Sequence, residues 1–143
     1  MRQVMLASGF ILLSAIPCFA ATTAPPVKVV ATTDAKFQTD VVDASAGRLI
    51  IVVFTASWCL PCGGVVGQLT FAAERRGFGL ATIDADTNSV IADRLKISSL
   101  PVTIAYRDGK SIGSHIGGFD RDSMDSFLTQ VGGLDVRLDQ QAR

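Results

Sequence analysis

The sequence contains few residues that could hold a metal ion or a cofactor. It has one histidine and three cysteines among 143 residues. A structural zinc ion takes about four nitrogen or sulfur ligands, and one Cys-x-x-Cys pair with a distant histidine cannot supply them. Covalent haem attachment requires a histidine directly after the second cysteine, where Gly63 stands. The acidic pair Asp84 and Asp86 offers too few oxygens for calcium. We therefore expect no metal and no cofactor, and we expect His115 at an exposed strand edge.

The sequence also lacks an excess of charge of either sign. It has 13 basic and 13 acidic residues, so its formal net charge is zero. No basic stripe is present, which argues against nucleic acid as a partner. No internal repeat is present either, and 143 residues suit a single domain.

A long apolar run is missing too. The most apolar region, residues 4–16, is about 13 residues long, whereas a membrane-spanning helix needs roughly 20. It follows Arg2 and precedes the small residues Ala20 and Ala21, an arrangement typical of a secretory signal peptide. We therefore expect a signal peptide at residues 1–20, or to 21, and a periplasmic or secreted protein. The alternatives are an uncleaved anchor and a lipid on Cys18, which Pro17 disfavours.

Removal of that leader would leave Cys59 and Cys62 as the two cysteines of the chain. A disulfide across two intervening residues closes a very short loop, so it removes little entropy from the unfolded state. The pair follows the apolar run 49–54 and precedes an expected helix. A helix start favours a thiolate on Cys59, and Cys62 can then close an intramolecular disulfide. The spacing therefore indicates redox chemistry.

Hydrophobic periodicity predicts an α/β domain at residues 27–133, after a linker at 21–26 and before a polar tail at 134–143. Thr32, Thr33 or Asp34 would cap the first helix, and Asp108-Gly109 predicts a hairpin. The crossovers imply a central mixed β-sheet flanked by helices on both faces. We expect strands at 27–31, 49–54, 80–85, 100–106 and 111–116, and helices ending at 47 and spanning 59–76, 90–95 and 120–131.

Three blocks of this sequence resemble the thioredoxin family. They are residues 36–41, residues 52–62 with Trp58-Cys59-Leu60-Pro61-Cys62, and residues 100–118 with Leu100-Pro101. The resemblance implies a thioredoxin fold, with Cys59 as the attacking thiol, Cys62 as the resolving thiol and Pro101 as a cis proline facing them. It also implies that protein substrates bind at Trp58, Leu60, Pro61, Leu100, Pro101, Ile116 and Gly117.

The sequence departs from the family at two positions. Members of the family carry a buried aspartate six residues before the first cysteine, where this chain has Val53, and a neighbouring lysine, where it has Thr82. The aspartate is thought to take the proton of the resolving cysteine, so the proton acceptor for Cys62 is not identified by the sequence. We also expect a depressed pKa for Cys59, because the helix start acts without an opposing buried acid.

We expect an exported thiol–disulfide oxidoreductase that reduces protein disulfides as a monomer. Pro61 is typical of reducing family members, and the histidine of oxidising members is absent. The family also implies a membrane thiol transporter as the electron donor. The alternatives are a periplasmic oxidase or isomerase, and a binding module whose disulfide does not cycle. The sequence does not identify the target protein or the reduction potential.

Overall fold

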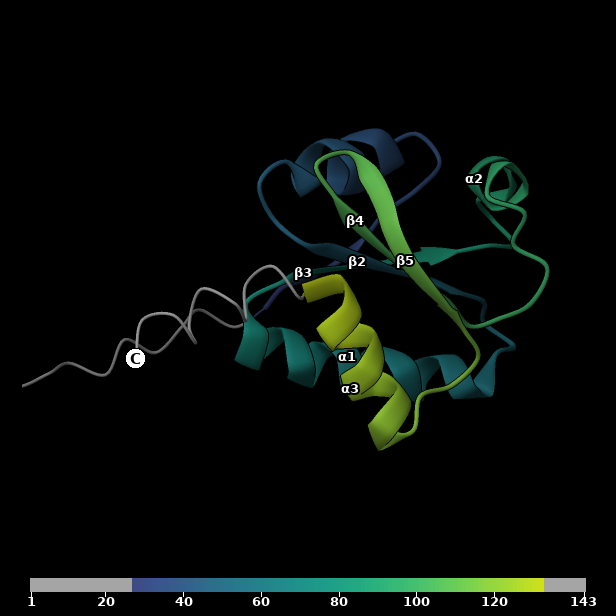
Figure 1. The fold of residues 1–143 in the computed structure, drawn as a ribbon. Helices are drawn as coiled ribbons and strands as arrows, with labels where there is room; N and C mark the ends of the chain where they lie inside the picture. Colours follow the sequence, from purple (N-terminus) through teal and green to yellow (C-terminus); the bar gives the residue numbers. More distant parts are fainter. Residues whose placement is uncertain (1–26, 133–143) are drawn as a thin grey trace, which may run out of the picture.

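The computed structural model describes residues 27–132, which form a five-stranded sheet with helices on both faces (Figure 1). The predicted signal peptide, linker and tail lie outside these residues. The strand order is β1-β3-β2-β4-β5. The strands are β1 Val29–Ala31, β2 Ile50–Thr55, β3 Gly79–Asp84, β4 Val102–Arg107 and β5 Lys110–Ile116. The helical elements are η1 Gln38–Val42, η2 Asp43–Ser45, α1 Leu60–Arg76, α2 Ser89–Arg94 and α3 Arg121–Gly132.

The sheet is mixed, as the sequence predicts. Strand β3 lies between β1 and β2 and is parallel to both, whereas β4 is antiparallel to β2 and β5. Strand β2 is buried on both faces, which explains its continuous apolar sequence. At the β4–β5 turn, Asp108 and Gly109 both have positive φ angles, of 52° and 76°. An Asp-Gly pair accommodates this conformation readily.

Two apolar clusters lie on opposite faces of the sheet. Helices α1 and α3 cover one face, where Leu69 and Phe127 belong to the same apolar cluster as Ile51. Segments η1 and α2 cover the other face, where Phe37 and Ile91 belong to the second cluster. The predicted α/β architecture is therefore confirmed.

The first predicted helix is wrong in type and in its cap. The chain forms a π-helical turn at Gln38–Val42 and a 3-10 turn at Asp43–Ser45 in its place. Asp34 does not cap this segment: its carboxylate accepts hydrogen bonds from the backbone N–H groups of Val90, at 3.1 Å, and Ile91, at 2.9 Å. Asp34 is a capping residue, as predicted, but it caps α2 and not the helix that follows it. Local sequence could not indicate this, because Val90 and Ile91 are more than fifty residues away.

We expect Asp34→Ala to destabilise the domain, because two N–H groups at the start of α2 would lose their acceptor. Loss of a helix cap costs about 0.5–2 kcal/mol. Urea unfolding measures this effect, with the exposed Asp93→Ala on α2 itself as the matched control. Equal stability of the two variants would contradict the capping role.

Helix α1 is continuous from Leu60 to Arg76, although it contains three glycines. Its buried residues, Cys62, Val65, Leu69 and Ala73, recur at helical spacing. The helix ends at Gly77, whose φ of 78° is left-handed and suits glycine. The three glycines therefore do not interrupt the helix.

Two glycines should respond to alanine in opposite directions. A Cβ at Gly67 would meet nothing within 4 Å, whereas one at Gly113 on β5 would lie 2.7 Å from Cγ1 of Val131. We expect Gly67→Ala to stabilise the domain by about 0.8–1 kcal/mol through helix propensity. Gly113→Ala should cost about 1–3 kcal/mol through overpacking against α3. Thermal unfolding of both variants tests this contrast, and shifts of the same sign would refute it.

Asp120 caps the start of helix α3. Oδ1 of Asp120 accepts hydrogen bonds from the backbone N–H and the hydroxyl of Ser123, both at 2.7 Å. The pKa of Asp120 lies below its usual value. The hydrogen bond from the backbone N–H of Ser123 is the largest cause, and the bond from the Ser123 hydroxyl is the next. Phe127, Leu128 and Val131 are the buried residues of this helix.

Candidate active site

A disulfide joins Cys59 and Cys62 where the chain passes from β2 into α1. The two Cα atoms are 5.5 Å apart, and the two residues are only 8% and 3% exposed. Cys59 occupies the N-cap position with an extended backbone, ψ 91°. Pro61 stands in the first turn, where a proline loses no intrahelical hydrogen bond. The pair therefore occupies the helix start that the sequence predicts.

The position at the helix start determines the electrostatics of the pair. The first backbone N–H groups of a helix point along the axis towards its start and carry partial positive charge. A thiolate at Cys59 lies in this field, which favours the charged sulfur over the neutral thiol. Reduction of the disulfide would therefore produce a nucleophilic sulfur at Cys59 and a more buried thiol at Cys62.

The Leu100–Pro101 loop lies against the disulfide. Its peptide bond is cis, as the family resemblance implies. Leu100 packs against the small apolar cluster that contains both cysteines. The backbone N–H of Gly117 donates to the carbonyl of Pro101 at 2.8 Å, and Ile116 pairs with Val102. The Leu100–Pro101 loop therefore connects the end of β5 and the start of β4 to the redox pair.

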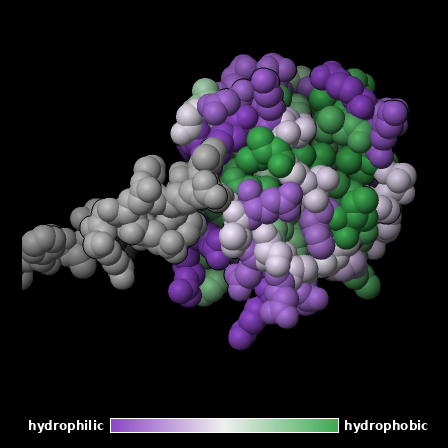
Figure 2. All heavy atoms as spheres, viewed as in Figure 1, coloured by the Kyte–Doolittle hydropathy of each residue, from purple (hydrophilic) through white to green (hydrophobic). Residues whose placement is uncertain are grey.

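Large apolar side chains are exposed near the disulfide. Trp58 is 65% exposed, Leu60 is 91% exposed and Ile116 is 69% exposed. Figure 2 shows apolar residues gathered towards the end of the molecule where α1 begins. Exposed apolar side chains of this size indicate a surface for contact with another molecule.

Asp86 is a residue of this site that the sequence did not identify. Asp86 is exposed on the loop between β3 and α2, and its Oδ2 accepts a hydrogen bond of 2.8 Å from Nε1 of Trp58. The backbone N–H of Asp86 donates in turn to Oδ1 of Asp84. No local pattern could have indicated this contact, since Trp58 and Asp86 are 28 residues apart. Asp86 thus holds the indole that stands next to Cys59.

Val53 is fully buried in the sheet and has no acidic neighbour across the strands. It pairs with Thr82 on β3 and with Thr103 on β4. Within residues 27–132, the buried polar residues are Thr32, Ser45, Asn88 and Thr103, and none of them is an acid. The Thr103 hydroxyl is buried without a hydrogen-bond partner in this part of the chain. The sheet beneath α1 therefore holds no buried carboxylate in the described region.

His115 lies on the edge strand β5, as predicted, but its side chain is less exposed than expected. Its ring is half-buried and stacks on Phe119, with ring centroids 4.0 Å apart and an interplanar angle of 17°. Its Nε2 lies 3.0 Å from the carbonyl oxygen of Gly118. These contacts give His115 a packing role at the end of β5.

Residues 27–132 contain neither a cluster of metal ligands nor a membrane-spanning helix. In that range, no group of three or more histidine, cysteine, aspartate or glutamate residues could hold a metal ion. No helix in the same range is both long and apolar enough to cross a membrane.

Comparison with known proteins agrees with this geometry. The family model described as thioredoxin matches residues 28–130. A thioredoxin of Mycobacterium bovis is 36% identical over 101 residues, which cover 69% of this chain and 85% of that protein. A thioredoxin of Chlamydia trachomatis is 30% identical over 94 residues, or 65% of this chain and 92% of that protein. The crystal structure of Fasciola hepatica thioredoxin has a TM-score of 0.63 at 24% identity, covering 72% of this chain and 99% of its own.

A Cys-x-x-Cys disulfide at a helix start, on this sheet and beside a cis proline, defines a thiol–disulfide oxidoreductase. The family match covers most of the chain and includes both cysteines. The chain belongs to the thioredoxin family.

Proposed function

We propose that this protein is an exported reductase of protein disulfides. The observation that carries the proposal is the Cys59–Cys62 disulfide at the start of α1, framed by exposed apolar side chains. An apolar frame suits a folded or extended polypeptide as the substrate better than a small polar thiol. Pro61 between the cysteines supports the reducing direction, as the family resemblance implies.

The reaction is a two-electron exchange in two steps. In the dithiol form, the Cys59 thiolate attacks one sulfur of a substrate disulfide, which releases one substrate thiolate and forms a mixed disulfide. The thiolate of Cys62 then attacks the Cys59 sulfur and releases the second substrate thiolate. The protein ends as the Cys59–Cys62 disulfide, and the substrate gains two electrons and, in water, two protons.

The substrate segment would bind along the cis-proline loop. The backbone groups of Leu100 would pair with an extended segment by strand addition. The apolar surface would be formed by Trp58, Leu60, Ile116 and Gly117, with Pro61 and Pro101 completing the floor around the disulfide. Leu60 lies between the cysteines and is nearly fully exposed, so a partner with an apolar recess would bury it.

Residues 1–20 support export, because a charged residue, a short apolar run and small residues follow one another there. An exported reductase requires electrons from the cytoplasmic side. A membrane thiol transporter of the kind that family relatives use would regenerate the dithiol by exchange with the Cys59–Cys62 disulfide. The protein would act as a monomer.

Cys59 should have a thiol pKa below the ordinary value of about 8.5. The helix start stabilises its thiolate, and Val53 provides no buried negative charge to oppose it. The ultraviolet absorbance of the thiolate, followed against pH in the reduced protein, measures this pKa. The Cys59→Ser variant supplies the matched background, and a value at or above that of a free thiol would contradict the proposal.

Reduction of insulin by dithiothreitol tests the function. We expect the wild-type protein to accelerate insulin precipitation and Cys59→Ser to give only the background rate. An absence of acceleration by the wild type would favour a binding module. A reduction potential near −270 mV would support a reductase, whereas a value near −120 mV would favour an oxidase.

A further inference from the structure

The segment at the end of β5 carries part of the proposed substrate surface. Residues 116–118, which we name the docking loop, consist of the last residue of β5 and two glycines before α3. Ile116 is 69% exposed, and Gly117 has a left-handed φ of 95°. A Cβ at Gly117 or at Gly118 would meet nothing within 4 Å. Because consecutive glycines have wide conformational freedom and no side chains to pack, the shape of this loop depends on its hydrogen bonds.

Two hydrogen bonds hold the docking loop. The backbone N–H of Gly117 donates to the carbonyl of Pro101 at 2.8 Å, which ties the loop to the cis-proline segment. Nε2 of His115 lies 3.0 Å from the carbonyl oxygen of Gly118, which ties the loop back to β5. A carbonyl oxygen only accepts, so Nε2 must carry the proton and donate it. The side chain of His115 therefore fixes the second glycine of the loop.

The ring of His115 is itself held by aromatic neighbours. It stacks on Phe119, with ring centroids 4.0 Å apart, and its centroid lies 6.3 Å from that of Phe127. Both phenylalanines are buried and belong to the apolar cluster on the α1 and α3 face of the sheet. A ring held in this way loses little conformational entropy when it donates to the carbonyl. The hydrogen bond thus joins an exposed loop to the buried core.

We propose that His115 is a positioning residue for polypeptide substrates, acting through the docking loop. Its Nε2–H holds the carbonyl of Gly118, which keeps Ile116 and Gly117 in the arrangement that meets a segment bound at the cis-proline loop. Without this bond the loop would populate other arrangements, and the apparent affinity would fall in proportion to the fraction that stays competent. This inference rests on the proposed function, because it concerns the same substrate surface.

Two substitutions separate the hydrogen bond of His115 from its packing. His115→Phe keeps an aromatic ring against Phe119 but removes the donor, whereas His115→Gln removes the ring but keeps an N–H donor near the position of Nε2. We expect KM for eosin-labelled insulin, with dithiothreitol as the reductant, to rise about two- to fivefold in His115→Phe, because one surface hydrogen bond is lost. KM should rise less in His115→Gln. An unchanged KM in His115→Phe, or a fall in kcat alone, would overturn the proposal.

Amide hydrogen exchange tests the same role without a substrate. In the oxidised full-length protein, the Gly117 N–H is bonded to Pro101, so its exchange rate reports how often the docking loop opens. We expect this rate to rise about two- to fivefold in His115→Phe and to stay near the wild-type value in His115→Gln. Equal rates in His115→Phe and the wild type would show that His115 does not hold the loop. If the wild type failed to reduce insulin, the proposed function would be wrong, and the exchange rates would still decide the role of His115.

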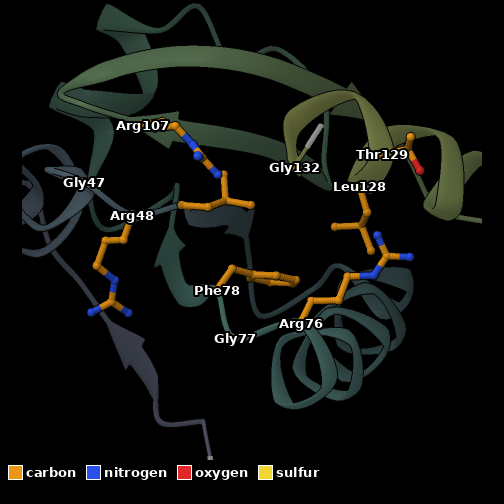
Figure 3. Close-up of a pocket in the computed structure, with 10 residues that line it drawn as sticks. Gly47, Arg48, Arg76, Gly77, Phe78, Arg107, Leu128, Thr129 and Gly132 are labelled. Carbon is orange, nitrogen blue, oxygen red and sulfur yellow. The ribbon is translucent and has the colours of Figure 1, made fainter. Parts of the chain in front are cut away.

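The control substitution lies far from the docking loop. Thr129 is exposed on α3 and lines a cavity of about 610 Å³ at the opposite end of the molecule, to which no docking-loop residue contributes (Figure 3). Thr129→Ala should leave KM and the Gly117 exchange rate at their wild-type values, and changes as large as those in His115→Phe would refute a specific role for His115. Reduction of dithionitrobenzoate, a small disulfide, should be unchanged in every variant, since the cysteines form a cluster apart from the loop. Thermal unfolding checks the fold, and His115→Leu replaces His115→Phe if the latter is unfolded.

Discussion

Cys62→Ser should stop the reaction after its first half and accumulate a covalent complex with the substrate. Cys59 would still attack a substrate disulfide, because its position at the start of α1 is unchanged. The serine hydroxyl cannot attack the mixed disulfide at a useful rate, because its pKa lies far above that of a thiol. The covalent complex is measured by non-reducing electrophoresis of extracts from cells that express the variant, and mass spectrometry then identifies the trapped protein.

The matched control for this trap is Cys59→Ser, which keeps one thiol but places it at the more buried position. Cys62 is 3% exposed, compared with 8% for Cys59, and it lies within the helix instead of at its cap. We expect few or no complexes with Cys59→Ser. Equal trapping by the two variants would mean that Cys62 is the attacking residue, which would reverse the assignment of the two thiols.

Val53→Asp should remove much of the stability of the domain at neutral pH. Val53 is 0% exposed and lies in the middle of β2. Full burial raises the pKa of a carboxyl by up to about 3–5 units. At about 1.36 kcal/mol per unit, ionisation at this position would cost about 4–7 kcal/mol, against a typical total stability of about 5–15 kcal/mol.

The effect of Val53→Asp should depend on pH with a known sign. The folded state would hold its proton above pH 4, whereas the unfolded chain would release it near an ordinary pKa of about 3.9. Stability should therefore fall as the pH rises from about 4 to the raised pKa of the folded state, and then become constant. Urea unfolding at several pH values measures this slope. The neutral Val53→Asn should lose stability without this slope, and a pH-independent loss in both variants would show that the new carboxylate reaches water.

The sheet and the redox pair could be predicted from sequence because local patterns determine them. Strand β2 is buried on both faces and therefore has an uninterrupted apolar sequence, and the Asp108-Gly109 turn has its own residue signature. The cis state of Pro101 came from the family resemblance alone, since no local pattern specifies it. The structure confirms these features.

Long-range contacts could not be predicted in the same way. The partners of Asp34 lie on α2 and that of Trp58 lies on the loop before α2, so both depend on how the sheet brings distant segments together. Export, the electron donor and the monomeric state stay predictions.

The hydrogen bond that holds Trp58 belongs to a longer chain of such bonds. The backbone N–H of Asp34 donates to the Asn88 side chain, whose amide donates to the carbonyl of Asp84; the Asp84 carboxylate then accepts from Asp86. Loosening at the Asp34 end would therefore reach the indole beside Cys59. Since Trp58 is the sole tryptophan, its fluorescence is an intrinsic reporter for the redox site and for the opening of the 84–88 loop.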